Sequence, residues 1–316
     1  MNNNLIKKFL WFVLGFLVLV AIVFLSKTFL SESFASENRG VRVEEVRATG
    51  QDDSPVFINI SKIPFPTELD FCGERVPLEN PEIRIRAERE FYLLLQQPGQ
   101  LALYIKRSGK YFPLYERIIK EMNLPDDLKY LSVAESALFQ SRSSKDAFGL
   151  WQFMEGTARS YGLRVDKYVD ERAHFEKSTR AALTYLSASR RSLGSWTLAA
   201  AGYNMGNTGV RNAMTRQKVD NYYDLWLNEE TSRFIFRIVI IKELMKNSKK
   251  YGIDFSQDEL YNFGRTKIVT VNGAIANLYD WALSHNNLYK DVKILNPWIR
   301  TTELPTGKWE ITIYDK

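Results

Sequence analysis

An uncharged run of eighteen residues near the N-terminus, FLWFVLGFLVLVAIVFLS at 9–26, most constrains what this chain can fold into. At about 1.5 Å of rise per residue, a helix of this length reaches roughly the thickness of the hydrocarbon core of a bilayer. A secretory signal normally has a shorter apolar region, of roughly 7 to 15 residues. The run therefore predicts a retained transmembrane helix, and the alternative is a signal that is cleaved near Ser33-Phe34-Ala35.

Lysines flank this run on both sides. Lys7 and Lys8 precede it and Lys27 follows it. The positive-inside rule then places the short N-terminus in the cytoplasm and the rest of the chain beyond the inner membrane, in the periplasm. Cys72 lies far downstream, so a lipid-modified N-terminal cysteine is not expected. The prediction is a single-pass inner-membrane protein; with a cleaved signal it would be periplasmic.

Composition excludes several classes of function. The three anchor lysines account for half of the formal charge of +6, so a nucleic-acid partner is not predicted. With one cysteine and only His174 and His285, disulfides and thiolate or histidine-rich metal sites lack ligands, and a Ser-His-Asp triad would need one of these histidines. No glycine-rich nucleotide motif occurs. We therefore predict no metal and no cofactor, and expect the chemistry to rest on carboxylates.

Helical patterns begin near Ile83 and dominate the rest of the chain, so the fold is predicted to be mainly α. Ser178 is predicted to cap a helix over 181–193, and Ser195 one over 196–203. Apolar residues at helical spacing over 229–248 indicate a core helix, with no site implied: Phe234, Ile238, Ile241 and Met245.

The pattern changes after Gly264. The stretch KIVTV predicts a strand, 275–284 and 289–295 predict short helices, and WEITIY predicts a closing strand. This small α+β appendage either packs on the helical part with a purely structural role or binds glycan, and the sequence leaves both interpretations open.

Glu135 is the first candidate for chemistry. It closes a helix predicted to begin near Pro125, and it shares a face with Leu128 and Leu131 because residues four and seven positions apart stack along a helix. Burial without a cationic partner would raise the pKa of the carboxyl group and keep its proton available for a leaving oxygen. From spacing alone, a glutamate at a helix end that turns into solvent is the commoner arrangement.

Other motifs follow Glu135 in order. They are Glu135-Ser136, Ser143, GLWQFM at 149–154 and GYNMG at 202–206. At these residues the chain resembles the lytic transglycosylases of the soluble-transglycosylase (SLT) superfamily, of the membrane-bound murein transglycosylase D type. The resemblance extends from LDFCGERVP at residue 69 to the helix EETSRFIFRIVIIKELMKN, and 268–316 resemble a degenerate LysM-like segment.

The resemblance implies a lysozyme-like fold and a single catalytic residue. Glu135 would protonate the glycosidic oxygen and then, as a carboxylate, take the proton of the muramoyl 6-hydroxyl, giving a 1,6-anhydro sugar without a second carboxylate. Ser143, Gln152, Tyr203 and Asn204 match positions that line the glycan groove. The implied partner is the peptidoglycan glycan strand, with the membrane contacted through 9–26.

The predicted architecture combines both lines of reasoning. It is a mainly α, lysozyme-like transglycosylase domain with a small C-terminal α+β appendage of LysM-like type and an N-terminal transmembrane helix. The predicted boundaries are an anchor at 1–30, a polar tether at 31–54, an N-terminal extension packing on the core at 55–105, the catalytic domain at 106–250 and the LysM-like segment at 251–316.

The chain also departs from the family pattern. Asp146 stands where glycine is common, Glu155 where proline is common, and Gly202 where alanine is common. These acidic residues, with Asp170 and Glu171, are assigned to solvation or local capping and left out of the catalytic set. Two alternatives stay open: a goose-lysozyme-like hydrolase, and a non-catalytic scaffold that binds the cell wall.

Overall fold

A computed structural model describes residues 62–316. The predicted anchor at 1–30 with its transmembrane helix at 9–26, the tether at 31–54 and the first residues of the N-terminal extension lie outside the described residues. From Lys62 onward, no helix has both the length and the apolar character needed to cross a membrane.

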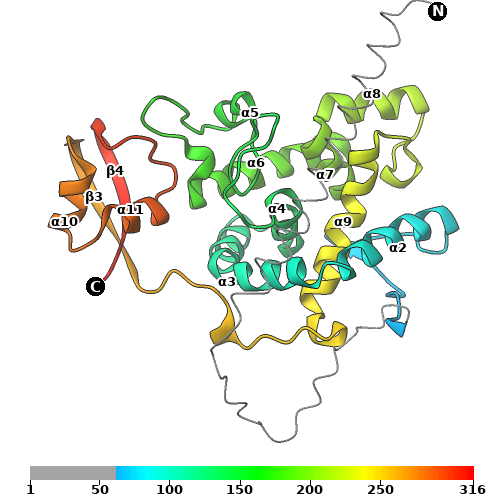
Figure 1. The fold of residues 1–316 in the computed structure, drawn as a ribbon. Helices are drawn as coiled ribbons and strands as arrows, with labels where there is room; N and C mark the ends of the chain where they lie inside the picture. Colours follow the sequence, from blue (N-terminus) through cyan, green and yellow to red (C-terminus); the bar gives the residue numbers. More distant parts are fainter. Residues whose placement is uncertain (1–61) are drawn as a thin grey trace, which may run out of the picture. The chain divides into compact units, whose positions relative to one another are not determined.

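The described part is mainly helical, as predicted, and ends in two strands with two short helices between them (Figure 1). The helices are α2 (Pro81–Leu95), α3 (Pro98–Glu121), α4 (Lys129–Ser136), α5 (Glu155–Ser160), α6 (Phe175–Leu193), α7 (Trp196–Met205), α8 (Asn207–Gln217), α9 (Glu229–Lys246), α10 (Leu278–Ser284) and α11 (Tyr289–Leu295). The strands are β1 (Asp70–Phe71), β2 (Glu74–Arg75), β3 (Thr266–Ile275) and β4 (Leu304–Tyr314).

Two helix starts test the capping predictions. The Ser195 hydroxyl accepts a hydrogen bond from the Leu198 amide at 3.1 Å, which confirms it as the N-cap of α7. The prediction for Ser178 is wrong, because α6 begins a turn earlier. His174 caps α6 instead: its Nδ1 accepts from the Lys177 amide, as an asparagine oxygen would. Ser178 is buried inside the helix.

Helix α9 crosses the helical part and organises its core (Figure 1). It contacts α2, α3, α4 and α7, and the prediction of a core helix is confirmed by the burial of Phe234, Ile238 and Ile241. Side chains from 69–251 form one hydrophobic cluster around it. Because α9 lies between the extension helix α2 and α4, it carries residues toward the space beside Glu135.

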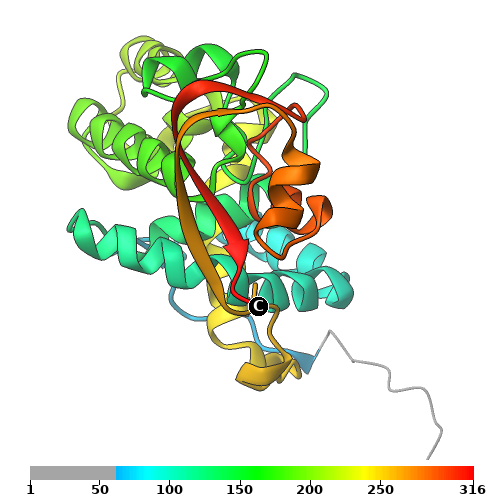
Figure 2. The same cartoon turned by 90° about the vertical axis from the view of Figure 1, so that its left-hand side faces the viewer.

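The C-terminal part is an antiparallel ribbon of β3 and β4, with α10 and α11 beside it (Figure 2). The register runs from Thr266 opposite Tyr314 to Ile275 opposite Leu304. The helix predicted from Ile275 begins only at Leu278. Strand β3 continues through Ile275, and the Asn277 side chain caps the helix by accepting from the Tyr279 amide at 2.8 Å.

The segment 166–173 of the helical part is built into this C-terminal part. Val169 and Ala173 belong to its hydrophobic cluster, and Val169 forms a β-bridge with Ile299. The Asp170 amide donates to the Trp298 carbonyl at 2.8 Å. The appendage is therefore joined to the helical part by main-chain hydrogen bonds as well as by apolar packing.

Candidate active site

Glu135 lies in the last turn of α4. Leu128 and Leu131, which precede it on the same face, are fully buried, and Glu135 itself is half-buried. The helix stops directly after it: Ala137 and Leu138 both have left-handed backbone conformations, with φ of 56° and 54°. Such conformations are costly for residues other than glycine and concentrate at functional sites. Because the chain turns sharply there, Glu135 lies at the C-terminal end of α4.

The loop that carries the GLWQFM motif is fastened to α4 next to Glu135. The hydroxyls of Ser132 and Ser136 both donate to the Leu150 carbonyl, at 3.0 and 2.8 Å. Trp151 is fully buried and its indole nitrogen donates to Thr179 at 3.0 Å. The serine after the candidate acid therefore has a structural role: it holds the loop against the helix.

A buried ion pair supports the same loop from behind. The guanidinium of Arg172 is bound by both carboxylate oxygens of Asp170, at 2.9 and 2.8 Å. It also donates to the main-chain carbonyls of Asp146 and Phe153, at 2.9 and 3.2 Å. The assignment of Asp170 to solvation or simple capping is thus incomplete, because Asp170 caps a 3-10 turn and also balances a buried charge.

Gly149 shows how tightly this loop is packed. Its φ is +90°, and a Cβ atom there would lie 2.1 Å from the main-chain oxygen of Arg172. We expect Gly149→Ala to lower the free energy of unfolding by about 2 kcal/mol or more, from backbone strain and this clash. Gly156→Ala is the control in α5, where a Cβ meets nothing within 4 Å, and should stabilise by about 0.5–1 kcal/mol. Denaturant unfolding measures both, and equal effects would contradict the expected clash.

A cavity of about 200 Å³ opens beside Glu135. Ala134 and Glu135 contribute from α4, and Asn204 from α7. The remaining lining residues come from α2 and from one face of α9: Glu90, Glu230, Arg233, Phe234 and Arg237. Two glutamates and two arginines therefore accompany the candidate acid in one small space.

The electrostatics of this space favour a protonated Glu135. Burial raises the pKa of its carboxyl group to about 8, and the nearby Glu230 carboxylate acts in the same direction. The Arg237 guanidinium opposes this rise but does not cancel it. A carboxylic acid that keeps its proton at neutral pH can deliver that proton to a leaving oxygen.

This pKa predicts a pH profile. The kcat/KM of a reaction that needs the acid form should be level around pH 7 and fall about tenfold per pH unit above about 8. Glu230→Gln removes a neighbouring negative charge and should shift this alkaline limb to lower pH. Glu229→Gln, an exposed neighbour on α9 outside the cavity lining, is the control and should leave the limb in place. A limb near pH 4.5, where an ordinary carboxyl titrates, would contradict the assignment.

Of the predicted groove residues, Asn204 lines the cavity itself. Its Nδ2 donates to Glu230 at 3.0 Å, and its Oδ1 accepts from the Thr231 hydroxyl at 2.7 Å. Tyr203 lies nearby: burial raises its pKa well above the usual value, and the charge of Glu135 adds to that rise. The Tyr203 hydroxyl donates to the Trp151 carbonyl at 2.7 Å. It therefore ties α7 to the motif loop.

Ser143 and Gln152 lie on the motif loop and do not line the cavity. Ser143 is exposed, and its hydroxyl accepts from the Ala147 amide at 3.0 Å. The Gln152 amide donates to the carbonyls of Ser141 and Gly149, at 3.0 and 2.8 Å. In this structure Gln152 shapes its own loop.

The α9 helix holds residues that the sequence did not predict as part of a site. The interpretation of 229–248 as core without a site is incomplete, because Glu230, Arg233 and Arg237 face the cavity. They stand three to four positions apart with Phe234 between them, which places them on one helical face. A polar stripe of this spacing also marks any solvated helix face, so the sequence carried no distinguishing signal.

Two family models match the chain. Residues 116–225 match the transglycosylase SLT domain, and residues 267–313 match the soluble lytic transglycosylase C-terminal LysM-like domain. The chain thus contains an SLT domain followed by a LysM-like domain, which confirms the resemblance drawn from its motifs. Glu135 and the motif loop lie within the SLT domain.

The relatives it resembles include the membrane-bound lytic murein transglycosylase D of Escherichia coli, in strain K12 and in strain CFT073 of serotype O6:H1. The chain is 30% identical to each over 190 residues, which is 58% of this chain and 42% of the relative. The match therefore spans less than half of the relatives' length.

Proposed function

We propose that the chain is a peptidoglycan lytic transglycosylase in which Glu135 is the single acid and base. The observation that carries this proposal is the half-buried Glu135 carboxyl, which lies within the matched SLT domain, has a pKa raised to about 8 and stands beside a cavity. The raised pKa fits the first step, and the backbone strain at Ala137 and Leu138 fits a position held for function.

The reaction follows from this one group. Glu135 gives its proton to the glycosidic oxygen of a MurNAc–GlcNAc bond as the bond from the muramoyl C1 breaks. The carboxylate left behind takes the proton of the muramoyl 6-hydroxyl, whose oxygen closes on C1 to form the 1,6-anhydro ring. The proton taken up in the second step restores the acid, so no water is consumed. Ser143, Gln152, Tyr203 and Asn204 are proposed to bind the glycan or to fix the loops that do.

The test is the chemistry of the products. The full chain in detergent is incubated with peptidoglycan sacculi, and the released fragments are analysed by mass spectrometry before and after reduction with borohydride. Anhydromuropeptides, which borohydride leaves unchanged, support the proposal. Fragments that gain two hydrogens on reduction indicate hydrolysis, and binding of sacculi without release indicates a scaffold.

One observation favours hydrolysis as the second candidate. Glu230 lines the same cavity as Glu135, and an inverting hydrolase needs a second carboxylate to activate water. Glu230→Gln separates the two reactions: a hydrolase should lose its activity, whereas a transglycosylase should keep it with a shifted pH profile. We favour the transglycosylase, because the Glu230 carboxylate already binds Asn204 and lies within 3.9 Å of Lys145.

We also propose the location and the division of the chain. A retained helix within 1–30 would hold the enzyme at the inner membrane with its catalytic domain in the periplasm, and the relatives named above are described as membrane-bound. The proposed catalytic domain is 106–250, with the extension at 55–105 and the LysM-like segment at 251–316 on either side of it. Membrane fractionation with an alkaline wash would separate a retained anchor from a cleaved signal.

A further inference from the structure

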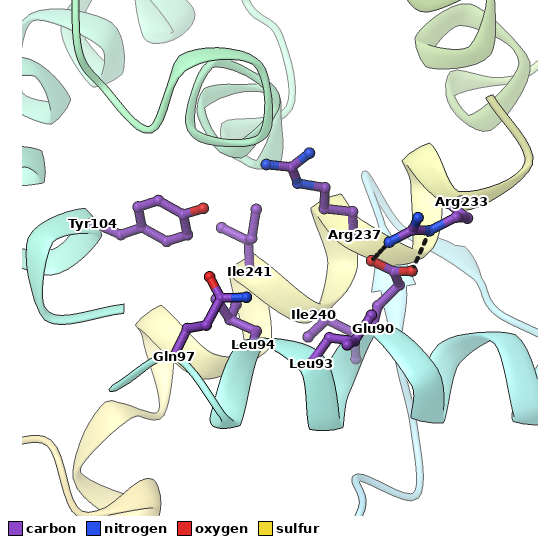
Figure 3. Close-up of a pocket in the computed structure, with 9 residues that line it drawn as sticks. All are labelled: Glu90, Leu93, Leu94, Gln97, Tyr104, Arg233, Arg237, Ile240 and Ile241. Atoms are coloured by element: carbon purple, nitrogen blue, oxygen red, sulfur yellow. Dashed lines mark hydrogen bonds and ion pairs between the residues drawn. The ribbon is translucent and has the colours of Figure 1, made fainter. Parts of the chain in front are cut away.

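A second cavity, of about 380 Å³, lies next to that of Glu135 (Figure 3). The two cavities share Glu90, Arg233 and Arg237 in their walls, so they adjoin. The walls of the second cavity come from α2, the start of α3 and α9, outside residues 116–225 that match the SLT domain. This cavity is therefore built by parts of the chain that flank the segment matching the SLT domain.

The lining combines an apolar side with a few polar groups. Leu93 and Leu94 of α2 and Ile240 and Ile241 of α9 supply the apolar surface. The polar groups of Gln97, Tyr104 and Arg237 point toward the same space (Figure 3). Within residues 62–316, none of these three side chains has a hydrogen-bond or ion-pair partner. Polar groups left free around a cavity are available to a ligand.

The charge of the cavity is positive. The Arg233 guanidinium is held by Glu90, with Nε 2.7 Å from Oε1, and this pair is close to neutral as a unit. Arg237 remains as the charge without a counter-ion among the described residues. A guanidinium beside an apolar surface is well suited to a carboxylate, because its planar donors match both carboxylate oxygens.

We propose that this cavity binds the acidic peptide branch of the glycan, an inference that rests on the function proposed above. The muramoyl unit next to the scissile bond bears a short peptide with free carboxylates, alanine methyl groups and amides. In the cavity, Arg237 binds a carboxylate, the leucine and isoleucine side chains contact the methyl groups, and Gln97 and Tyr104 bond the amides. The chain therefore selects glycan that still carries its peptides.

The ligand is a peptide and not a further sugar of the strand. Sugar rings are commonly bound on exposed aromatic faces, whereas the one aromatic residue in this lining is Tyr104, which is almost fully buried. The apolar surface of four aliphatic side chains suits methyl groups better than hydroxyls, which would lose hydrogen bonds with water there.

The experiment compares two substrates: glycan strands with their peptides, and strands of the same length from which the peptides have been removed. The full-length wild-type chain should have a higher kcat/KM for the peptide-bearing strands. Arg237→Gln should reduce that preference roughly 10- to 100-fold, as expected for loss of a charged hydrogen bond, and Arg237→Lys should restore part of it. The ratio between substrates is the readout, because Arg237 also lowers the pKa of Glu135 and so alters the rate on both.

Gln97→Leu provides a variant without that complication. Gln97 lines the second cavity but not the cavity of Glu135. The Gln97→Leu variant should cleave peptide-bearing strands more slowly than the wild type and cleave peptide-free strands at the wild-type rate. Equal cleavage of both substrates by the wild type, or equal losses on both in Gln97→Leu, would overturn the peptide proposal while leaving the transglycosylase in place.

A binding measurement is independent of turnover. Titration calorimetry with a synthetic alanyl-isoglutamyl-lysine tripeptide should detect binding to the wild type and to Glu135→Gln, and loss of binding in Arg237→Gln. The same tripeptide with its carboxylates amidated should not bind. If neither glycan is cleaved, the proposed function fails, and the tripeptide result alone decides for or against the cavity.

Discussion

Replacing Glu135 with glutamine is expected to lower the rate of glycan cleavage by about 10²- to 10⁴-fold, the usual contribution of a positioned general acid and base. The amide fills the same space beside the cavity but cannot deliver a proton to the glycosidic oxygen. The rate of release of soluble fragments from sacculi measures the effect. Glu155→Gln, in an exposed pair with Arg159 on α5, is the matched control and should retain the wild-type rate.

The same variant should be more stable than the wild type at pH 8. The folded-state pKa of Glu135, about 8, lies above the ordinary value of 4.5. Between these values the folded protein holds a proton that the unfolded chain releases, so the free energy of unfolding falls as pH rises, by at most about 1.4 kcal/mol per pH unit. Glutamine does not titrate, so the free energy of unfolding of Glu135→Gln lacks this pH dependence. The difference in stability from the wild type at pH 8 should vanish below pH 4.5. Full activity in the variant, or a pH-independent stability difference, would argue against Glu135 as the buried acid.

Arg172→Leu is expected to lower the free energy of unfolding by about 3–5 kcal/mol, because it leaves the buried Asp170 carboxylate without its main partner. It also removes the donors that hold the carbonyls of Asp146 and Phe153. Urea denaturation followed by circular dichroism measures this change.

Two further variants serve as a control and as a test of the buried charge. Arg75→Ala removes an exposed arginine that pairs with Glu79, and no measurable change in stability is expected. Changing Asp170 and Arg172 to leucine together removes both buried charges and should recover part of the loss. A loss below about 1 kcal/mol in Arg172→Leu would mean that Arg142, 3.5 Å from Asp170, already balances its charge.

Periodicity predicted the helices better than it predicted which of their faces would matter. Phe234, Ile238 and Ile241 repeat at core spacing, and burial confirms the helix that they indicated. Glu230 and Arg237 stand four positions before and three after Phe234, along the edge of the same face of α9, and in sequence a solvated edge looks the same as a cavity wall. Only the packing of α2 and α4 around α9 makes that face part of a cavity.

The site residues show a similar limit. The motifs placed Glu135 and Asn204 on different helices, and the structure brings both to one cavity. Motif matching identifies residue types but not side-chain directions, which explains why the Gln152 amide could be assigned to glycan while it bonds Ser141 and Gly149. The buried partnership of Asp170 and Arg172 is equally invisible, because two charged residues this close usually lie at the surface.

The β-bridge between Val169 and Ile299 bears on the order in which the molecule matures. Residues 166–173 leave the ribosome long before β4, yet the apolar surface of Val169 and Ala173 is covered by residues of 275–313. Arg172, which donates hydrogen bonds to carbonyls of the motif loop, belongs to the segment 166–173. A nascent chain is therefore expected to complete the loop beside Glu135 only after β4 has been translated, so that the proposed cleavage of glycan would begin after synthesis of that strand.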